Sequence, residues 1–121
     1  MSKKVIIAGG REFKDRERLY EYMDRMLEHY GEIVIVCGMA KGADHLGYDW
    51  AEERDVKVDK HPANWNKFGR GAGMRRNLEM AKCSDVLVAF WDGESKGTRG
   101  MILDAIKEGL EVHVYRYQKE V

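Results

Sequence analysis

Short hydrophobic runs alternate with helical hydrophobic patterns along the whole chain. Three runs of strand length are almost entirely apolar and cover residues 5–8, 33–37 and 86–91. Continuous apolar runs are typical of strands that are buried on both faces, as in a parallel sheet. Two further runs, at 56–58 and 112–115, alternate apolar and polar residues. This alternation predicts strands at the more exposed edges of the sheet.

Four segments between these strands carry the 3.6-residue periodicity of amphipathic helices. Their apolar positions are Leu19, Tyr22, Met23, Met26, Leu27 and Tyr30; Leu46, Trp50 and Ala51; Met74, Leu78 and Ala81; and Met101, Ile102, Ala105 and Ile106. Gly31 and Gly109 are natural stops for the first and last helix, and the second is expected to end near Arg54. The pattern predicts one α/β domain over residues 1–121, with a doubly wound, mostly parallel five-stranded sheet flanked by about four helices.

The amino-acid composition is that of a globular domain and excludes several classes of protein. The chain has 121 residues, of which 44% are hydrophobic, enough to bury a core without disulfide staples. Its 21 basic and 21 acidic residues cancel, so the net charge gives no reason to expect a general nucleic-acid or membrane binder. We therefore expect neither nucleic acid nor a membrane as a partner.

The cysteines, the histidines and the N-terminal run narrow the chemistry further. Cys37 and Cys83 are widely separated thiols, which predicts small core residues in a reducing compartment. The apolar run at 5–8 is too short for a signal peptide or a membrane span. These features predict a cytoplasmic protein. The four histidines show no metal-ligand spacing with one another or with the cysteines, so no metal site and no cofactor are expected.

Glycine-bearing loops follow three of the predicted strands, at 9–13, 38–44 and 92–98. In an open α/β sheet, ligands bind at the carboxyl ends of the strands, near the switch in strand order. Each loop leads into a helix, whose first N–H groups and dipole suit a phosphate or a carboxylate. None of the loops matches the P-loop or the Gly-x-Gly-x-x-Gly motif, which argues against a P-loop NTPase and an NAD-dependent dehydrogenase.

The neutral total hides a basic segment. Residues 57–82 contain seven basic and two acidic side chains, a net charge of +5, so the rest of the chain carries −5. The segment includes a long stretch without regular pattern, 61–73, and a loop of that length in a small domain is often functional. Arg75 and Arg76 then enter the third helix, where positive charge opposes the dipole and invites an anion. Aromatic residues of the stretch either stack on a base or anchor the loop; these are Trp65 and Phe68.

Four motifs occur in order along the chain and together resemble one family. They are Gly9-Gly10-Arg11-Glu12-Phe13; Gly38-Met39-Ala40-Lys41-Gly42-Ala43-Asp44; His61-Pro62-Ala63-Asn64-Trp65 with Gly73-Met74-Arg75-Arg76-Asn77; and Gly93-Glu94-Ser95-Lys96-Gly97-Thr98. From residue 5 to 115 the chain resembles the YspA-like, cpYpsA-related branch of the SLOG superfamily. That superfamily also holds the Lonely Guy phosphoribohydrolases and the Rossmann-like domain of DNA-processing protein A. The resemblance implies a Rossmann-like fold that binds a phosphate-bearing nucleotide derivative, such as ADP-ribose or a nucleoside monophosphate, as a sensor or sequestering protein.

The resemblance also implies which residues contact this ligand. The expected phosphate- and ligand-binding residues are Gly9, Gly10, Arg11, Gly42, Asp44, Arg76, Asn77, Asp92, Gly93, Ser95, Gly97 and Thr98. The phosphate is expected on the helix start at Gly97 and Thr98, with Arg76 closing over it. Structural alternatives stay open for several of them: Thr98 and Asp44 are also good helix caps, and Asp92 is an ordinary turn residue.

Two other functions stay open as alternatives. The Lonely Guy signature Pro-Gly-Gly-x-Gly-Thr-x-x-Glu ends on a carboxylate, and the matching position here is Met101, which cannot act as an acid or base. A nucleotide N-glycosidic-bond hydrolase would need a replacement such as Asp92 or Glu94, so the catalytic residues are unassigned. The second alternative is a DNA-binding module, with which the basic segment is compatible. Exposed apolar helix positions suggest a homo-oligomer.

Overall fold

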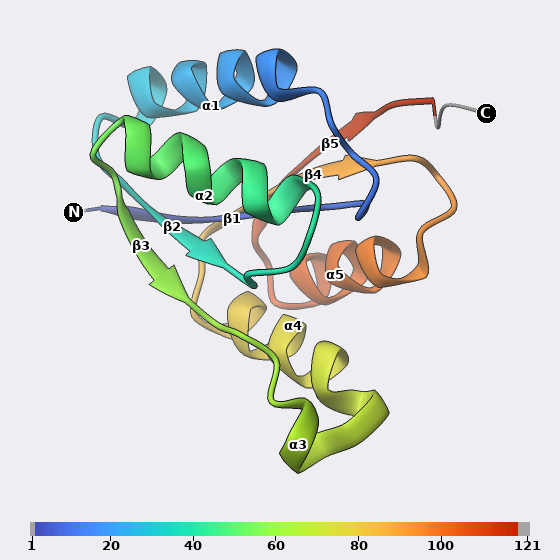
Figure 1. Ribbon diagram of the computed structural model, residues 1–121. Coiled ribbons are helices and arrows are strands. Elements are labelled where there is room, and N and C mark those ends of the chain that lie inside the picture. The colour runs from blue at the N-terminus through green and yellow to red at the C-terminus, as the bar shows by residue number, and fades with distance from the viewer. Residues whose placement is uncertain (1, 119–121) are drawn as a thin grey trace.

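In the computed structural model, which describes residues 2–118, a five-stranded sheet lies between two layers of helices (Figure 1). The elements in chain order are β1 (Lys3–Gly9), α1 (Arg16–Tyr30), β2 (Ile33–Cys37), α2 (Ala43–Glu53), β3 (Lys57–Lys60), α3 (Trp65–Phe68), the 3₁₀ turn η1 (Gly69–Gly71), α4 (Ala72–Lys82), β4 (Val86–Trp91), α5 (Lys96–Lys107) and β5 (Glu111–Arg116). The predicted strands and main helices are therefore all confirmed.

The strand order is β3-β2-β1-β4-β5, and every neighbouring pair is parallel. The chain runs outward from β1 to β3, then returns to the other side of β1 to form β4 and β5. This arrangement is the doubly wound, Rossmann-like topology that the sequence predicts. Its switch in strand order lies between β1 and β4, so the crevice at their carboxyl ends is where a ligand site is expected.

The continuous apolar strands are buried because each face of the sheet is covered by its own pair of helices. In β1, Val5 and Ile7 belong to the core beneath α1 and α2, which also contains Trp50. Ile6 and Ala8 point to the opposite face and belong to the core beneath α4 and α5. Figure 1 shows these two layers on either side of the sheet. The alternating strands β3 and β5 lie at the edges, as predicted.

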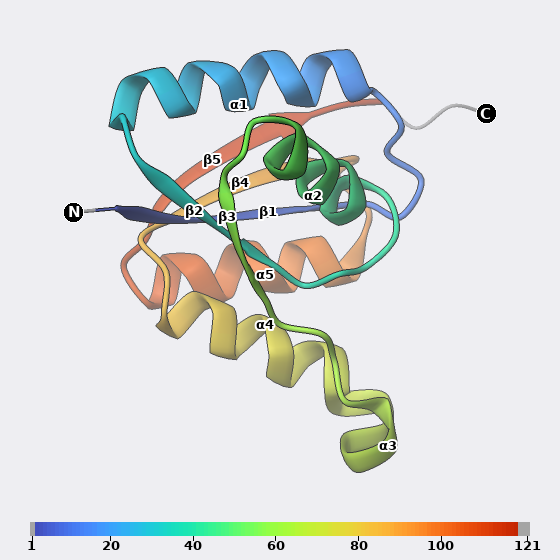
Figure 2. The same ribbon diagram turned by 60° about the vertical axis from the view of Figure 1, so that its left-hand side comes forward.

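Two sequence predictions about side-chain burial are wrong. The third helix forms as α4, but its inward residues are Ala72, Met80 and Ala81, whereas Met74 is 77% exposed. The reason is that the first half of α4 extends past the sheet together with α3, as Figure 2 shows, so periodicity alone does not give its core face. Cys83, expected in the core, caps the exposed end of α4.

The stretch 61–73, which showed no regular pattern in the sequence, is also partly helical, since it contains α3 and η1. Asn64 caps α3 by accepting a hydrogen bond from the Lys67 N–H at 3.1 Å. Among the helices of residues 2–118, none combines the length and apolar character needed to cross a bilayer.

Candidate ligand-binding cleft

A cleft of about 700 Å³ lies at the carboxyl end of β1. This volume falls within the range of roughly 300–1,000 Å³ that is usual for small-molecule sites. Four segments far apart in the sequence line it: the end of β1, the start of α2, the α3–α4 region and the start of α5. It brings together eight of the twelve predicted ligand-binding residues: Gly9, Arg11, Asp44, Arg76, Asn77, Ser95, Gly97 and Thr98.

The first turn of α5 forms one wall of the cleft. Ser95 is its N-cap, and its Oγ accepts a hydrogen bond from the Thr98 N–H at 3.5 Å and lies 3.2 Å from the Thr98 Oγ1. Ser95, not Thr98, therefore caps this helix. The N–H groups of Lys96 and Gly97 precede the first intrahelical bonds and have no acceptor within the helix. An added Cβ at Gly97 would meet nothing within 4 Å, so this wall is open to a ligand.

The loop before α5 is shaped by two predicted residues that lie outside the cleft lining. The Asp92 Oδ1 accepts hydrogen bonds from the N–H groups of Glu94 and Ser95, both at 2.8 Å. Gly93 has a φ of +86°, and a Cβ there would lie 2.2 Å from the Arg116 side chain. Asp92 and Gly93 thus set the path of the chain into α5.

Arg76 reaches from α4 to the carboxyl end of β2. Its Nη1 donates a hydrogen bond to the Gly38 carbonyl, and its Nε donates to the Asn77 Oδ1 at 2.9 Å. A Cβ at Gly38 would lie 2.7 Å from the Arg76 Nη1 and 2.9 Å from the Asp44 Oδ2. Gly38 was not among the predicted site residues, although it belongs to the second glycine loop. Its missing side chain makes room for the guanidinium, which Asn77 helps to orient.

Asp44 is a buried carboxylate at the start of α2. It is 7% exposed, and its Oδ2 accepts a hydrogen bond from the Ala40 N–H at 3.4 Å. Burial raises the pKa of Asp44 to about 6, although the positive charge of Arg76 acts in the opposite direction. A second carboxylate of the lining, Asp104, also has a pKa raised by burial. Asp104 was not predicted; its only sequence signal is its place three residues after Met101.

The glycines after β1 and β2 let two loops pack backbone against backbone. Gly42 has a φ of +81°, and a Cβ there would lie 2.1 Å from the Gly10 carbonyl oxygen. That oxygen accepts a hydrogen bond from the Ala43 N–H at 3.3 Å. A Cβ at Gly9 would lie 2.5 Å from the Phe90 carbonyl oxygen. The atoms that closely approach these glycines are therefore atoms of the protein itself. Gly10 and Gly42 lie outside the cleft lining.

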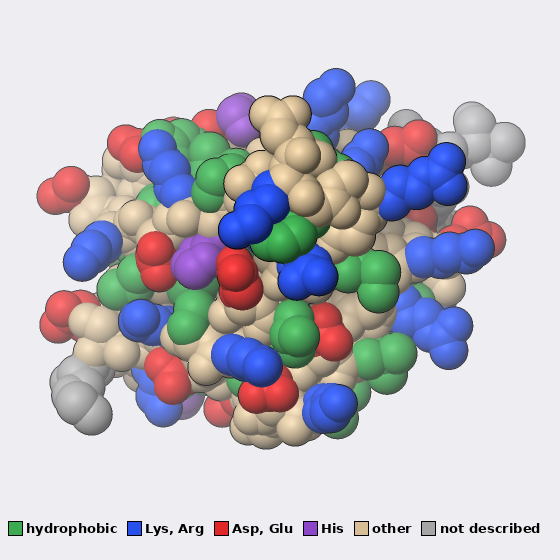
Figure 3. All heavy atoms as spheres, turned by 90° about the horizontal axis from the view of Figure 1, so that it is seen from below, with side chains coloured by type: hydrophobic (Ala, Val, Ile, Leu, Met, Phe, Trp, Pro, Cys, Tyr) green, Lys and Arg blue, Asp and Glu red, His purple; other side chains and the backbone are tan. Residues whose placement is uncertain are grey.

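The charges and aromatic groups of the lining favour an anionic ligand. Its charged residues are Arg11, Arg70, Arg75, Arg76 and Lys96, against Asp44 and Asp104. Trp65 also lines the cleft and is 53% exposed, so it does not anchor the loop in the core. Phe68 instead lies under the Arg75 guanidinium, whose Cζ is 4.4 Å from the centre of the Phe68 ring. Figure 3 shows that, on the underside seen there, basic side chains lie among hydrophobic and acidic ones.

The fold and the cleft define a Rossmann-like α/β domain with a crevice at the switch point of its sheet. Residues 3–68 match the model of the YspA, cpYpsA-related SLOG family. The Gene 61 protein of Mycobacterium phage D29 is 37% identical over 118 residues, covering 91% of this chain and 94% of that protein. The chain therefore belongs to the YspA, cpYpsA-related SLOG family, as its motifs indicated.

A solved structure is similar over most of the chain. DNA processing protein A (DprA) from Streptococcus pneumoniae superimposes with a TM-score of 0.75 at 19% sequence identity. The match covers 94% of this chain and 50% of that protein, so the chain spans half the length of this structural neighbour. At this level of identity the similarity concerns the fold, and it places this chain among Rossmann-like domains.

Proposed function

We propose that this protein binds a nucleotide or nucleotide-derived ligand in the cleft at the switch point, as a sensor or sequestering protein. The observation that carries the proposal is the convergence of predicted residues from four distant segments on one cleft of about 700 Å³. The excess of basic side chains in its lining favours a phosphate-bearing ligand.

In the proposed complex, the phosphate lies against the first turn of α5, where the N–H groups of Lys96 and Gly97 and the helix dipole favour an anion. Arg76 supplies charge-assisted hydrogen bonds to the phosphate from the opposite wall. Its guanidinium is oriented for this because the Nη1 already donates a hydrogen bond to the Gly38 carbonyl. In the same proposed complex, Asp44 of the cleft lining accepts a hydrogen bond from a ribose hydroxyl.

Calorimetric titration with nucleoside monophosphates and ADP-ribose tests the proposal. For whichever compound binds, Arg76→Ala is expected to weaken binding roughly 10- to 100-fold, the usual worth of a hydrogen bond to a charged group. The matched control is Arg25→Ala, because Arg25 lies on α1, is 77% exposed and pairs with Glu21 outside the cleft. Its affinity is expected to equal that of the unaltered protein.

A second variant tests ligand binding while leaving the hydrogen bond between Arg76 and Gly38 in place. Gly97→Ala adds a methyl group that meets no protein atom within 4 Å, so the melting temperature of the free protein is expected to hold. The same methyl group would occupy the space proposed for the phosphate, and affinity is expected to fall. Absence of binding across the whole panel, or unchanged affinity in both variants, would contradict the proposal.

Hydrolysis of an N-glycosidic bond is a second candidate, favoured by the two carboxylates of the cleft. Such a reaction adds water to C1′ of the ribose and releases the protonated base. Met101 is 1% exposed and offers no carboxylate, but Asp44 and Asp104 line the same cleft. A carboxyl group with a pKa near 6, as at Asp44, is suited to exchange protons near neutral pH.

Chromatography of incubated nucleoside monophosphates distinguishes this candidate from binding alone. Release of free base that is lost in Asp44→Asn or Asp104→Asn, while the ligand still binds, would support an enzyme. Ligand that binds and remains intact over long incubation would leave the protein as a binder.

A further inference from the structure

We propose that Asp59, His61 and Cys83 form a binding site for a transition-metal ion of the Zn²⁺ type. Each of the three side chains offers one donor atom, and these atoms all lie within 4.8 Å of one another. The His61 Nε2 lies 3.1 Å from the Asp59 Oδ2. In a tetrahedral site with metal–ligand bonds of about 2.0–2.3 Å, donor atoms are roughly 3.3–3.7 Å apart, so small side-chain movements bring all three onto one ion.

The backbone of all three residues is held in place. Asp59 belongs to β3 and pairs with Val36 of β2. The His61 N–H donates a hydrogen bond to the Cys37 carbonyl at 2.7 Å, which ties the residue after β3 to the same strand. Cys83 caps α4, with its N–H bonded to the Met80 carbonyl at 3.3 Å. Because the fold fixes these three backbone positions, the donors lose little conformational freedom when a metal binds.

The donor set points to a particular kind of ion. A thiolate, an imidazole and a carboxylate together suit Zn²⁺ or Co²⁺, whereas Mg²⁺ and Ca²⁺ prefer oxygen ligands alone. Cys83 is exposed and His61 and Asp59 are partly buried, so the thiol is accessible to an ion from solvent. On binding, the thiol proton passes to water and the sulfur bonds the metal as a thiolate. Three protein ligands leave a fourth position for water or another ligand.

Such a site would connect the two ends of the segment that carries Arg76 and Trp65. Figure 2 shows the chain leaving β3, passing in front of α4 and returning through α3 into α4. A metal at this position joins the edge strand to the last turn of α4. The segment between the ligands forms one side of the cleft, but the metal site stands on its own observations and does not depend on the identity of the cleft's ligand.

Co²⁺ is the probe of choice because its absorption reports the ligands directly. We expect the full chain, kept reduced by an agent that does not bind metals, to take up one Co²⁺ with a thiolate-to-metal charge-transfer band, and Zn²⁺ to displace it. Cys83→Ser is expected to abolish the band. The control is Cys37→Ser, the other thiol of the chain, which lies in the core at 1% exposure and is expected to keep the band.

Zn²⁺ affinity, measured by competition with a chelating dye, tests the other two ligands. Loss of a residue that only hydrogen-bonds to a metal ligand typically weakens metal binding roughly 10- to 100-fold. His61→Ala and Asp59→Asn each remove a direct ligand, so each is expected to weaken Zn²⁺ binding by at least this much. His45→Ala is the matched control, since its ring pairs with Asp49 at 3.8 Å on α2 and is not part of the cluster. A protein without the charge-transfer band, or variants that bind Zn²⁺ as tightly as the unaltered chain, would overturn the proposal.

Discussion

At the scale of single residues, the second glycine loop has two different uses. Gly42 allows the loop after β2 to contact the loop after β1 backbone to backbone, in a conformation that residues with a side chain rarely adopt. Gly38 instead leaves space for the guanidinium of Arg76, a residue of the cleft lining. One cluster of glycines in the sequence therefore serves the fold at one position and the cleft at the other.

Gly42→Ala is expected to destabilise the protein by about 2–4 kcal/mol, because the backbone conformation is unfavourable for alanine and the methyl group overlaps the Gly10 carbonyl. Urea unfolding followed by circular dichroism measures this. The control is Gly71→Ala, where φ is ordinary and an added Cβ meets nothing within 4 Å, so its free energy of unfolding is expected to change by less than about 1 kcal/mol. Equal effects would show that the contact between the two loops is unimportant.

Asp44 is expected to make stability depend on pH. Because burial raises its pKa to about 6 in the folded protein, the folded state holds a proton that the unfolded chain releases near pH 4. Its contribution to stability is therefore full at low pH and is lost as pH rises to about 6. Urea unfolding measures this effect as the free energy of unfolding of Asp44→Asn minus that of the unaltered protein. This difference is expected to rise by up to about 3 kcal/mol between pH 4 and pH 7. A pH-independent difference between the two proteins would contradict the raised pKa.

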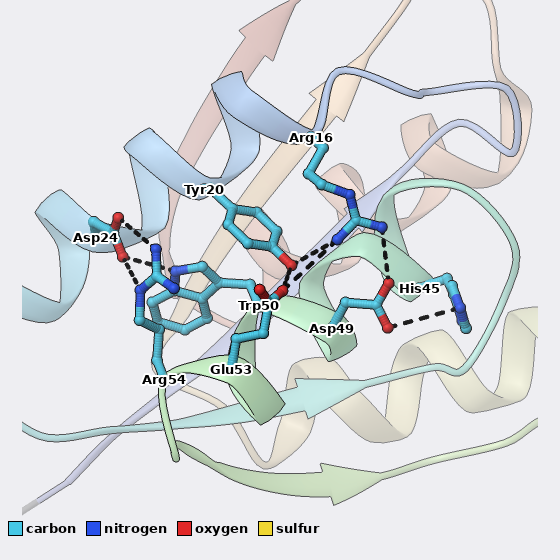
Figure 4. A network of polar contacts seen from close by, with 8 residues as sticks. All are labelled: Arg16, Tyr20, Asp24, His45, Asp49, Trp50, Glu53 and Arg54. Atoms are coloured by element: carbon cyan, nitrogen blue, oxygen red, sulfur yellow. Dashed lines mark hydrogen bonds and ion pairs between the residues drawn. The ribbon is translucent and has the colours of Figure 1, made fainter.

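At the scale of elements, polar contacts fasten α1 to α2 at the edge of the core (Figure 4). The Trp50 Nε1 donates a hydrogen bond to the Asp24 Oδ1 at 2.9 Å, and Arg54 pairs with the same carboxylate at 2.8 Å. The hydrogen bond from Arg54 lowers the pKa of Asp24. Further along the helices, Arg16 pairs with Asp49 at 3.0 Å. Because these ion pairs are partly exposed, the hydrogen bond of the buried indole contributes most.

Asp24→Ala is expected to cost about 1–3 kcal/mol, since it leaves the N–H of buried Trp50 without its partner. Thermal unfolding of the two purified proteins gives the difference. Glu21→Ala is the control on the same helix: it removes an exposed pair with Arg25 and is expected to cost only about 0.2–0.5 kcal/mol. If both variants melt alike, the Trp50 contact adds nothing to stability.

At the scale of the whole molecule, α4 and α5 carry exposed hydrophobic side chains. These are Met74 and Leu78 on α4, and Leu103 and Ile106 on α5. Leu103 is 54% exposed and Ile106 is 59% exposed. The two helices lie side by side. Met74 and Leu78 also line the cleft, whereas Leu103 and Ile106 lie outside its lining. This arrangement agrees with the self-association suggested by the sequence, which stays a prediction.

Sedimentation velocity tests this prediction. The unaltered protein is expected to form an oligomer at micromolar concentration, and Leu103→Glu combined with Ile106→Glu is expected to shift it to the monomer, because buried apolar area drives association. Lys107→Glu changes the charge of the same helix without removing apolar area and is expected to leave the oligomer intact. An unaltered protein that sediments as a monomer would refute the prediction.

Much of the fold and part of the cleft followed from local patterns. The apolar runs and helix periodicity predicted every main element, and the motifs predicted Arg76 and Gly97 in the cleft. Asp104 was missed because no motif marks it, and the direction of Met74 was wrong because α4 extends beyond the sheet it covers. The cluster of Asp59, His61 and Cys83 could not be predicted from the sequence. Its members are separated by up to 24 positions, and the fold alone brings their side chains together.

The sequence by itself determined the order of strands and helices, because the hydrophobic period of a segment reflects which of its faces are buried. It also indicated the family, through motifs that lie in the loops. Tertiary structure alone decided which of the predicted residues line the cleft and which lie outside its lining, as Gly97 and Asp92 show. The physical reason is that the carboxyl ends of parallel strands bring distant segments together, and the distances between side chains there depend on how the helices pack on the sheet.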